Sequence, residues 1–225
     1  MAREILDRKI RLLLDEILIL DSMVENVTIE AVDALKKRDV EAARRVYAQD
    51  AQINAKRFEL ENDCVITIAT QQPIMAGDLL LIASILEVVG ELERIGDYAK
   101  GIAKICILMG GRPHVKPLID IPRMAEIATS MLHRAVTAFV ASDAKSAREI
   151  PAEDAQVDAL YNQVYRELVT IMLGNPATID QANHLMWVAH NLERMADRVT
   201  NICERTVYVA TGEMKEISAS DDEIQ

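Results

Sequence analysis

AVDALKKRDVEAARRVYAQDAQIN (residues 31–54) and AVTAFVASDAKSAREIPAEDAQVD (residues 135–158) decide the fold, because the second stretch repeats the first without a gap. A later segment of each half repeats as well, at an offset of 100 residues, and charged positions recur in both places. Such duplication predicts two copies of one structural unit. Identical pairs include Ala31/Ala135, Asp39/Asp143, Arg44/Arg148, Asp50/Asp154, Gln52/Gln156, Leu92/Leu192, Glu93/Glu193, Arg94/Arg194 and Asp97/Asp197.

Apolar residues recur at spacings of three and four along most of the chain, which is typical of amphipathic helices. The chain has only eight Gly and six Pro, too few for the frequent turns of an all-β protein. The fold class that we expect is therefore all-α, with two tandem duplicated antiparallel three-helix bundles. The expected helices cover residues 3–37, 40–72, 76–109, 121–141, 144–173 (kinked or restarted at Pro151) and 178–211.

One segment near the middle is rich in helix breakers, from Gly110 to Pro117. We therefore predict a first bundle at 1–111, a linker at 112–117 and a second bundle at 118–213. Residues 214–225 are polar and acidic and have no periodicity, so this tail is expected to be disordered.

The formal net charge is −11, which opposes general binding to nucleic acid or to an anionic membrane surface. No export signal is evident, and the most apolar stretch, residues 79–89, is too short to span a bilayer. Cys64, Cys106 and Cys203 lie in apolar helical patterns and are expected to be buried thiols. These features predict a cytoplasmic protein that reaches the membrane only through partners.

Acidic residues one helical turn apart are the main candidates for chemistry, because they point to the same side of a helix. Clusters of carboxylates suit iron, zinc, manganese or magnesium, whereas no pattern indicates an organic cofactor. The predicted metal ligands are Glu93, Asp97, Asp154, Asp158, Glu193 and Asp197, with Asp50 and His190 as weaker candidates.

A metal-free interpretation also fits these residues. Arg94 could pair with Asp97, and Arg194 with Asp197, at a spacing of three. His190 shares a helix face with Glu193, but it could equally be a hydrogen-bonded structural histidine. The acids would then form ion pairs in a helical interaction scaffold.

A carboxylate-bridged di-iron or ferritin-like protein is a further alternative. Such sites usually contain Glu-x-x-His on two helices, and no histidine of this chain has a Glu three residues before it. The chain also contains no phosphate-binding loop of the Walker type and no recognisable nucleophile motif. We therefore expect no catalysis.

The motifs LERIGD (92–97) and NLERMAD (191–197), together with QQP (71–73) and TNICER (200–205), resemble those of the PhoU family. The resemblance covers roughly residues 5–213. It implies a non-enzymatic regulator that restrains phosphate uptake and the phosphate-starvation response. The implied partners are the ATPase of the phosphate-specific ABC transporter, a phosphate-sensing histidine kinase and a second copy of the chain in a homodimer.

Some members of this family hold multinuclear metal clusters on acidic pairs with three intervening residues, and the ligands predicted above match those positions. The first half departs from the pattern, since Asp50 is followed by Asn54 and Lys104 stands opposite Glu204. Leu80 also stands where the family often has arginine. The resemblance therefore implies that the second half is the better metal site.

Overall fold

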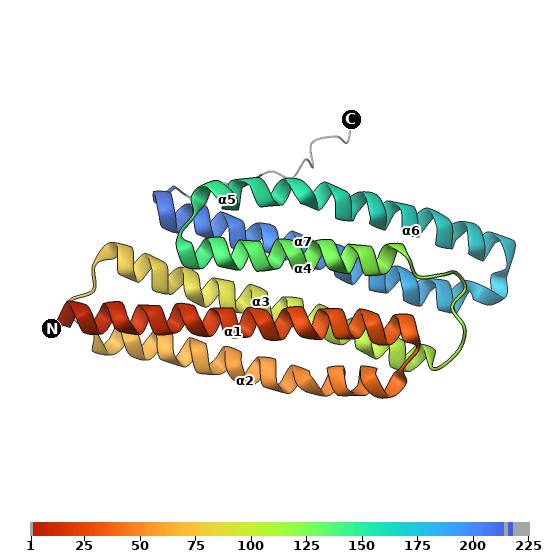
Figure 1. Cartoon of the computed structure of the whole chain (residues 1–225), viewed down its shortest axis with the longest axis horizontal. Helices are drawn as coiled ribbons and strands as arrows, with labels where there is room; N and C mark the ends of the chain where they lie inside the picture. Colours follow the sequence, from red (N-terminus) through yellow and green to blue (C-terminus); the bar gives the residue numbers. More distant parts are fainter. Residues whose placement is uncertain (1, 214–215, 218–225) are drawn as a thin grey trace.

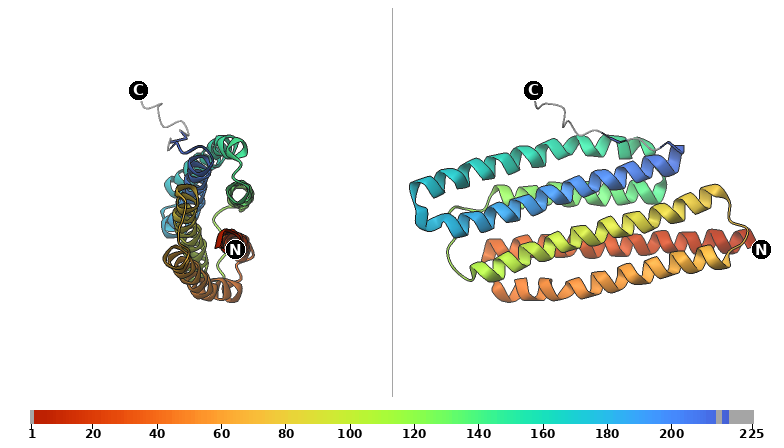
Figure 2. Two further views of the ribbon diagram at one scale, coloured as in Figure 1. Left: turned by 90° about the vertical axis from the view of Figure 1, so that its left-hand side faces the viewer. Right: turned by 180° about the vertical axis from the view of Figure 1, so that it is seen from behind.

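The computed structural model describes residues 2–213 and 216–217, and this part of the chain contains helices and no strand. The predicted all-α class with two tandem bundles is confirmed (Figure 1). Two 3₁₀ turns, η1 and η2, flank the helix of the second bundle that lies farthest from the first (Figure 2). The elements are α1 (Ala2–Lys37), α2 (Val40–Thr70), α3 (Ala76–Met109), α4 (Asp120–Ala141), α5 (Ala144–Glu149), η1 (Ile150–Glu153), α6 (Asp154–Gly174), η2 (Pro176–Thr178) and α7 (Ile179–Thr211).

Equivalent turns open α2 in the first bundle and α5 in the second. The Asp39 carboxylate accepts a hydrogen bond from the backbone N–H of Ala42 at 2.9 Å, and the Asp143 carboxylate accepts one from Ser146 at 3.2 Å. Such caps satisfy amide groups that have no partner inside the helix. Arg38 and Ser142, just before the caps, both adopt positive φ, at 60° and 53°. The repeated sequence thus produces the same local turn twice.

The two copies differ after these turns. Helix α2 runs without a break, whereas the matching stretch of the second copy divides into α5, η1 and α6. Pro151 in η1 has no amide hydrogen and cannot continue the α-helical hydrogen bonds, so the predicted restart is confirmed. Helix α2 ends at Thr70, two residues earlier than expected, with Gln71 as its C-cap and Pro73 shortly after.

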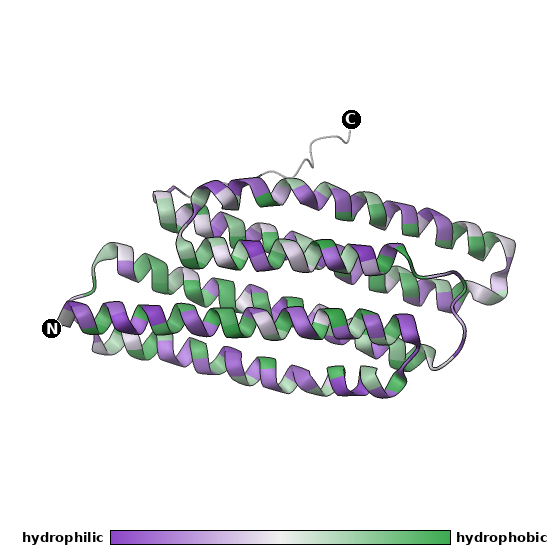
Figure 3. Cartoon of the chain, in the orientation of Figure 1, coloured by the Kyte–Doolittle hydropathy of each residue, from purple (hydrophilic) through white to green (hydrophobic). Residues whose placement is uncertain are grey.

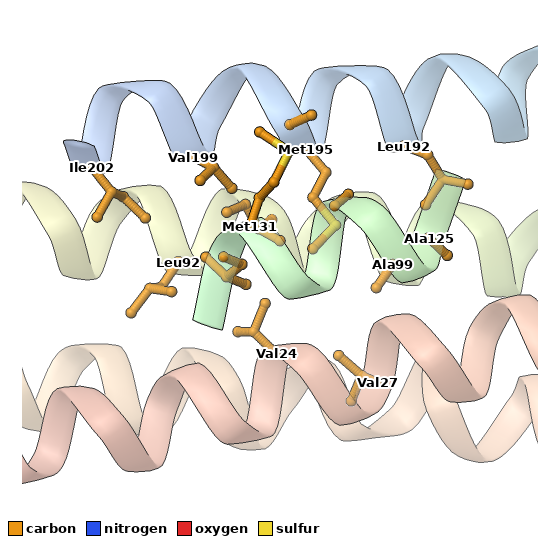
Figure 4. Packing of buried hydrophobic residues seen from close by; sticks show 14 of the residues in the cluster. Val24, Val27, Leu92, Ala99, Ala125, Met131, Leu192, Met195, Val199 and Ile202 are labelled. Carbon is orange, nitrogen blue, oxygen red and sulfur yellow. The ribbon is translucent and has the colours of Figure 1, made fainter. Parts of the chain in front are cut away.

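Both bundles share one apolar core. At the seam between the bundles, α1 packs against α4 and α3 packs against α7. Figure 4 shows side chains from all four helices meeting there, among them Val24, Leu92, Met131 and Met195. A β-carbon added at Gly101 would lie 2.8 Å from Asn191 Nδ2, so α3 and α7 approach closely at this glycine. The seam is therefore continuous with the interior of each bundle.

The outward faces are mixed, and polar residues predominate on the exposed side of most helices (Figure 3). Cys64, Cys106 and Cys203 are buried free thiols, as predicted. Within the described part of the chain, no helix combines the length and the apolar character that crossing a bilayer requires. Most of the tail predicted to be disordered, 214–215 and 218–225, lies outside the described residues. The Ile217 backbone N–H donates to Glu204 Oε1 at 2.9 Å.

Candidate metal centres on the acidic pairs

The predicted ligands lie on equivalent pairs of helices. Asp50 belongs to α2 and the pair Glu93 and Asp97 to α3, which packs against it. In the second copy, Asp154 and Asp158 belong to α6, and Glu193 and Asp197 to α7. Each copy therefore has one acidic group between its outer helix and the helix at the seam.

Basic side chains neutralise the acidic group of the first copy. Lys100 Nζ lies 2.6 Å from Asp50 Oδ2 and 3.8 Å from Asp97 Oδ1, and Arg57 Nη1 lies 3.0 Å from Glu93 Oε1. Asp50 Oδ2 also accepts a hydrogen bond from Asn54 Nδ2 at 3.1 Å. Lys100 and Arg57 thus lie within ion-pair distance of these carboxylates and would compete with a metal ion for them.

Partial burial raises the pKa of Asp97, and the negative charge of Asp50 raises it further. This direction is the one expected for two carboxylates held close together. Lys100 opposes the shift, because its positive charge favours the ionised form of Asp97. The lysine therefore compensates for the repulsion between the two acids.

The second copy has different cations beside its acidic group, because His190 and Arg194 both oppose the rise in the pKa of Glu193. Burial raises the pKa of Glu193, followed by the charges of Asp197 and, more weakly, Asp158. Arg194 Nη1 lies 2.7 Å from Asp197 Oδ2, which is the ion pair expected from the sequence. The corresponding expectation for Arg94 and Asp97 was wrong, because Arg94 pairs with Glu91 at 2.7 Å.

The two copies differ most at the positions of the cations. At the offsets of the repeat, the equivalents of Lys100 and Arg57 are Thr200 and Tyr161, which carry no positive charge. Thr200 Oγ1 is buried without a hydrogen-bond partner, and the buried Glu193 Oε2 lies 3.2 Å from the imidazole of His190. Burying a carboxylate oxygen is costly unless a donor or a cation binds it. The residues of the second copy therefore fit a metal ion.

His190 lies beside this group. Its Nδ1 atom is 3.2 Å from Glu193 Oε2, and its ring packs near those of Tyr161 and Trp187, with centroids 6.2 and 5.8 Å away. The aromatic contacts fix the orientation of the ring, so the nitrogen faces the acids. First-row transition metals accept such a mixed set of imidazole and carboxylate ligands.

The predicted ligands are not arranged as a closed cage. Among the residues that the structure describes, these acids provide no group of three ligand atoms that all lie within 4.8 Å of one another. Asp154 is buried, with 3% of its surface exposed, whereas Asp97 is exposed. Binding of an ion at Glu193 would thus require neighbouring carboxylates to move inward.

This chain matches the model of a known protein domain. The model of the PhoU domain matches the chain twice, over residues 17–106 and 121–206. The chain belongs to the PhoU family.

Similar PhoU proteins match almost the full length. A "Phosphate-specific transport system accessory protein PhoU homolog" from Clostridium acetobutylicum is 34% identical over 218 residues, which are 97% of this chain and 100% of that protein. The Aquifex aeolicus homolog of the same name is 36% identical over 200 residues, covering 89% of this chain and 90% of that protein.

Solved structures of PhoU proteins have the same fold as this chain. The PhoU regulatory protein of the phosphate transport system of Streptococcus pneumoniae superposes with a TM-score of 0.85 at 29% identity, covering 93% of this chain and 99% of the other. PhoU from Pseudomonas aeruginosa superposes with a TM-score of 0.86 at 31% identity, covering 92% of this chain and 99% of the other.

Each PhoU domain copy contains one LER-x-x-D motif, yet the surroundings of the two motifs differ. Sequence reasoning identified the acids but missed Lys100 and Arg57 as their partners. Lys100 lies three residues after Asp97, and this spacing could have indicated an ion pair between them. Arg57 lies on another helix, so only the packing of α2 against α3 reveals its contact with Glu93.

Proposed function

We propose that this PhoU-family protein is a cytoplasmic, non-enzymatic regulator of phosphate homeostasis. It restrains phosphate uptake through the phosphate-specific ABC transporter and represses the phosphate-starvation two-component response when phosphate is plentiful. The observation that carries the proposal is the double PhoU domain match, over residues 17–106 and 121–206. The names of the relatives, accessory proteins of phosphate-specific transport, support the same role.

The proposal includes one metal centre, in the second copy. Glu193, Asp197 and Asp158 would supply carboxylate oxygens and His190 an imidazole nitrogen, with the buried Asp154, one turn before Asp158 on α6, as a further candidate. Iron, zinc, manganese and magnesium all remain candidates for this donor set. A bound cation would offset the repulsion among the acids and lower the cost of burying Glu193.

The partners follow from the same assignment. The ATPase subunit of the transporter and the phosphate-sensing histidine kinase would bind the outer helix faces, and two copies of the chain would form a homodimer. A metal-free interaction scaffold is the second candidate function. The ion pairs of Lys100 and Arg57 favour that candidate for the first copy.

The test is a phosphate-starvation reporter in phosphate-rich medium, in a bacterial host whose own PhoU-family gene is deleted. The deletion should raise reporter output, and the wild-type chain should restore repression. Glu193→Gln with Asp197→Asn should fail to restore it, because both anionic ligands are lost while side-chain shape is kept. Immunoblotting and circular dichroism would check that the variant is abundant and folded.

The matched control is Glu93→Gln with Asp97→Asn, the same change in the copy whose acids are already neutralised. This variant should restore repression. If both double variants repress like the wild type, the scaffold function holds and the metal centre is rejected. If the deletion leaves the reporter silent, the regulatory assignment itself is wrong.

A further inference from the structure

A second polar cluster lies away from the acidic pairs, at the seam between the bundles. Asp21 and Glu25 occupy successive turns of α1, and His133 belongs to α4, which packs against it (Figure 1). Within the described residues, this is the group of at least three metal-binding side chains whose ligand atoms all lie within 4.8 Å of one another.

The three side chains of the cluster lie at increasing depth below the surface. The His133 side chain is 63% exposed, that of Glu25 22% and that of Asp21 3%. His133 Nδ1 lies 3.0 Å from Glu25 Oε1 and 3.9 Å from Asp21 Oδ2. An ion could therefore enter beside the imidazole and reach both carboxylates.

Asp21 is the buried member of the cluster. It is almost completely buried, and its Oδ1 atom has no hydrogen-bond partner. Burial raises the pKa of Asp21 to about 8, and the charge of Glu25 and a hydrogen bond with the Glu25 side chain contribute to this rise. In the described residues, neither Asp21 nor Glu25 pairs with a lysine or arginine, in contrast to Asp50 with its Lys100.

The repeat gives no structural reason for the cluster. At the 104-residue offset, the counterparts of Asp21, Glu25 and His133 are Ala125, Thr129 and Ile29. The same places in the other copy are thus filled without a charge. The repeated fold therefore forms without an acid at the position of Asp21.

The distances suit a transition-metal ion. Ligand atoms that are each about 2.1 Å from a common ion lie about 3.0–3.4 Å apart, depending on geometry. The contact between His133 and Glu25 already has this length, and the Asp21 oxygen would need to approach by about half an ångström. Two carboxylates and one imidazole suit Zn²⁺, with water completing its coordination.

We propose that Asp21, Glu25 and His133 bind one divalent transition-metal ion of the zinc class, which links α1 to α4 across the seam. The site is independent of the acidic pairs and of the regulatory role proposed above. On binding, the ion displaces the proton that Asp21 carries and neutralises the two carboxylates. Because α1 belongs to the first bundle and α4 to the second, the ion would fasten one PhoU domain to the other.

The test uses the full-length protein, stripped of metal with a chelator, in the Glu193→Gln/Asp197→Asn background so that the second-copy acids do not compete. Zn²⁺ is titrated by isothermal calorimetry. The background protein should bind one equivalent. His133→Gln and Asp21→Asn should each lower the affinity by about 10-fold to 100-fold. His184→Gln on α7, which changes another histidine outside the cluster, should leave binding unchanged.

Two further readouts guard against misfolding. The metal-free variants should retain helical circular dichroism, and Asp21→Asn should not lower the melting temperature, since it replaces a buried acid by an uncharged amide of nearly the same size. Zn²⁺ should slow amide hydrogen exchange in α1 and α4 of the background protein but not of His133→Gln. The proposal is overturned if His133→Gln binds Zn²⁺ like the background protein, or if His184→Gln weakens binding to the same extent.

Discussion

The two copies of the PhoU domain carry the same acidic motif in opposite electrostatic settings. In the first copy, Lys100 and Arg57 lie within ion-pair distance of Asp50 and Glu93. In the second copy, Thr200 and Tyr161 stand in their places, and a buried carboxylate oxygen of Glu193 lies 3.2 Å from the imidazole of His190. Duplication thus preserved the scaffold and the anions, while the counterions diverged. The acids of the first copy pair with Lys100 and Arg57, and those of the second copy lie beside His190 and Arg194.

The largest effect is expected when the two cations of the first copy are introduced into the second copy, because this exchange removes the difference between them. Thr200→Lys with Tyr161→Arg places positive charges where Lys100 and Arg57 lie in the first copy. We expect the affinity of the second-copy site for Mn²⁺ or Zn²⁺ to fall by about 100-fold or more, because the lysine occupies the site and repels the ion. Equilibrium dialysis with metal analysis measures this affinity.

Thr170→Lys, an added lysine at an exposed position of α6, is the control for that exchange. It should change metal affinity by less than about threefold, since exposed charges are screened by salt. Equal losses in the two proteins would mean that general charge, rather than occupation of the site, governs binding.

The reverse exchange should have an intermediate effect. Lys100→Thr with Arg57→Tyr leaves Asp50, Glu93 and Asp97 without their cations, and we expect the free energy of unfolding to fall by about 1–2 kcal/mol. Added Mn²⁺ should restore part of that loss by binding the freed acids. Urea denaturation with and without metal measures both quantities.

Lys104→Thr, one turn further along α3 at an exposed position, is the control. It should leave stability within about 0.5 kcal/mol of the wild type. A double variant that is as stable as this control would show that the two cations do not stabilise the first copy.

The smallest expected effect concerns a pair outside the metal centres. Arg134 binds Glu153 through two contacts, of 2.7 and 2.6 Å, whereas the matching residues of the first copy, Glu30 and Gln49, form a single 3.3 Å hydrogen bond. Glu153→Gln makes the second copy resemble the first here. We expect the free energy of unfolding to fall by about 0.5–1 kcal/mol at neutral pH, a small change because the pair is partly exposed.

This loss should depend on pH. Arg134 lowers the pKa of Glu153, so the folded protein binds fewer protons at this site than the unfolded chain. The stabilisation is therefore complete above the unfolded pKa, at about 4.5, and disappears as the pH falls through the lower folded value. Urea denaturation at neutral and strongly acidic pH measures it, with Glu149→Gln as a nearby exposed control. A loss that persists in acid would contradict the assignment.

Much of the fold was predictable because its determinants are local. The 3.6-residue periodicity, the caps at Asp39 and Asp143 and the break at Pro151 all act within a few residues. The acidic pairs were visible for the same reason. Contacts between helices were not: Arg57 meets Glu93, and His133 meets Asp21, through packing of segments far apart in sequence. Spacing along one helix cannot reveal a partner on another.

The single core shared by α1, α3, α4 and α7 has a consequence for cooperativity. Leu92, Met131 and Met195 are buried where the two halves meet (Figure 4). Either half alone would expose a broad apolar face to water, at a cost of about 25 cal/mol for each Å². The two repeats therefore depend on each other for solubility, and a disturbance at the seam weakens both at once.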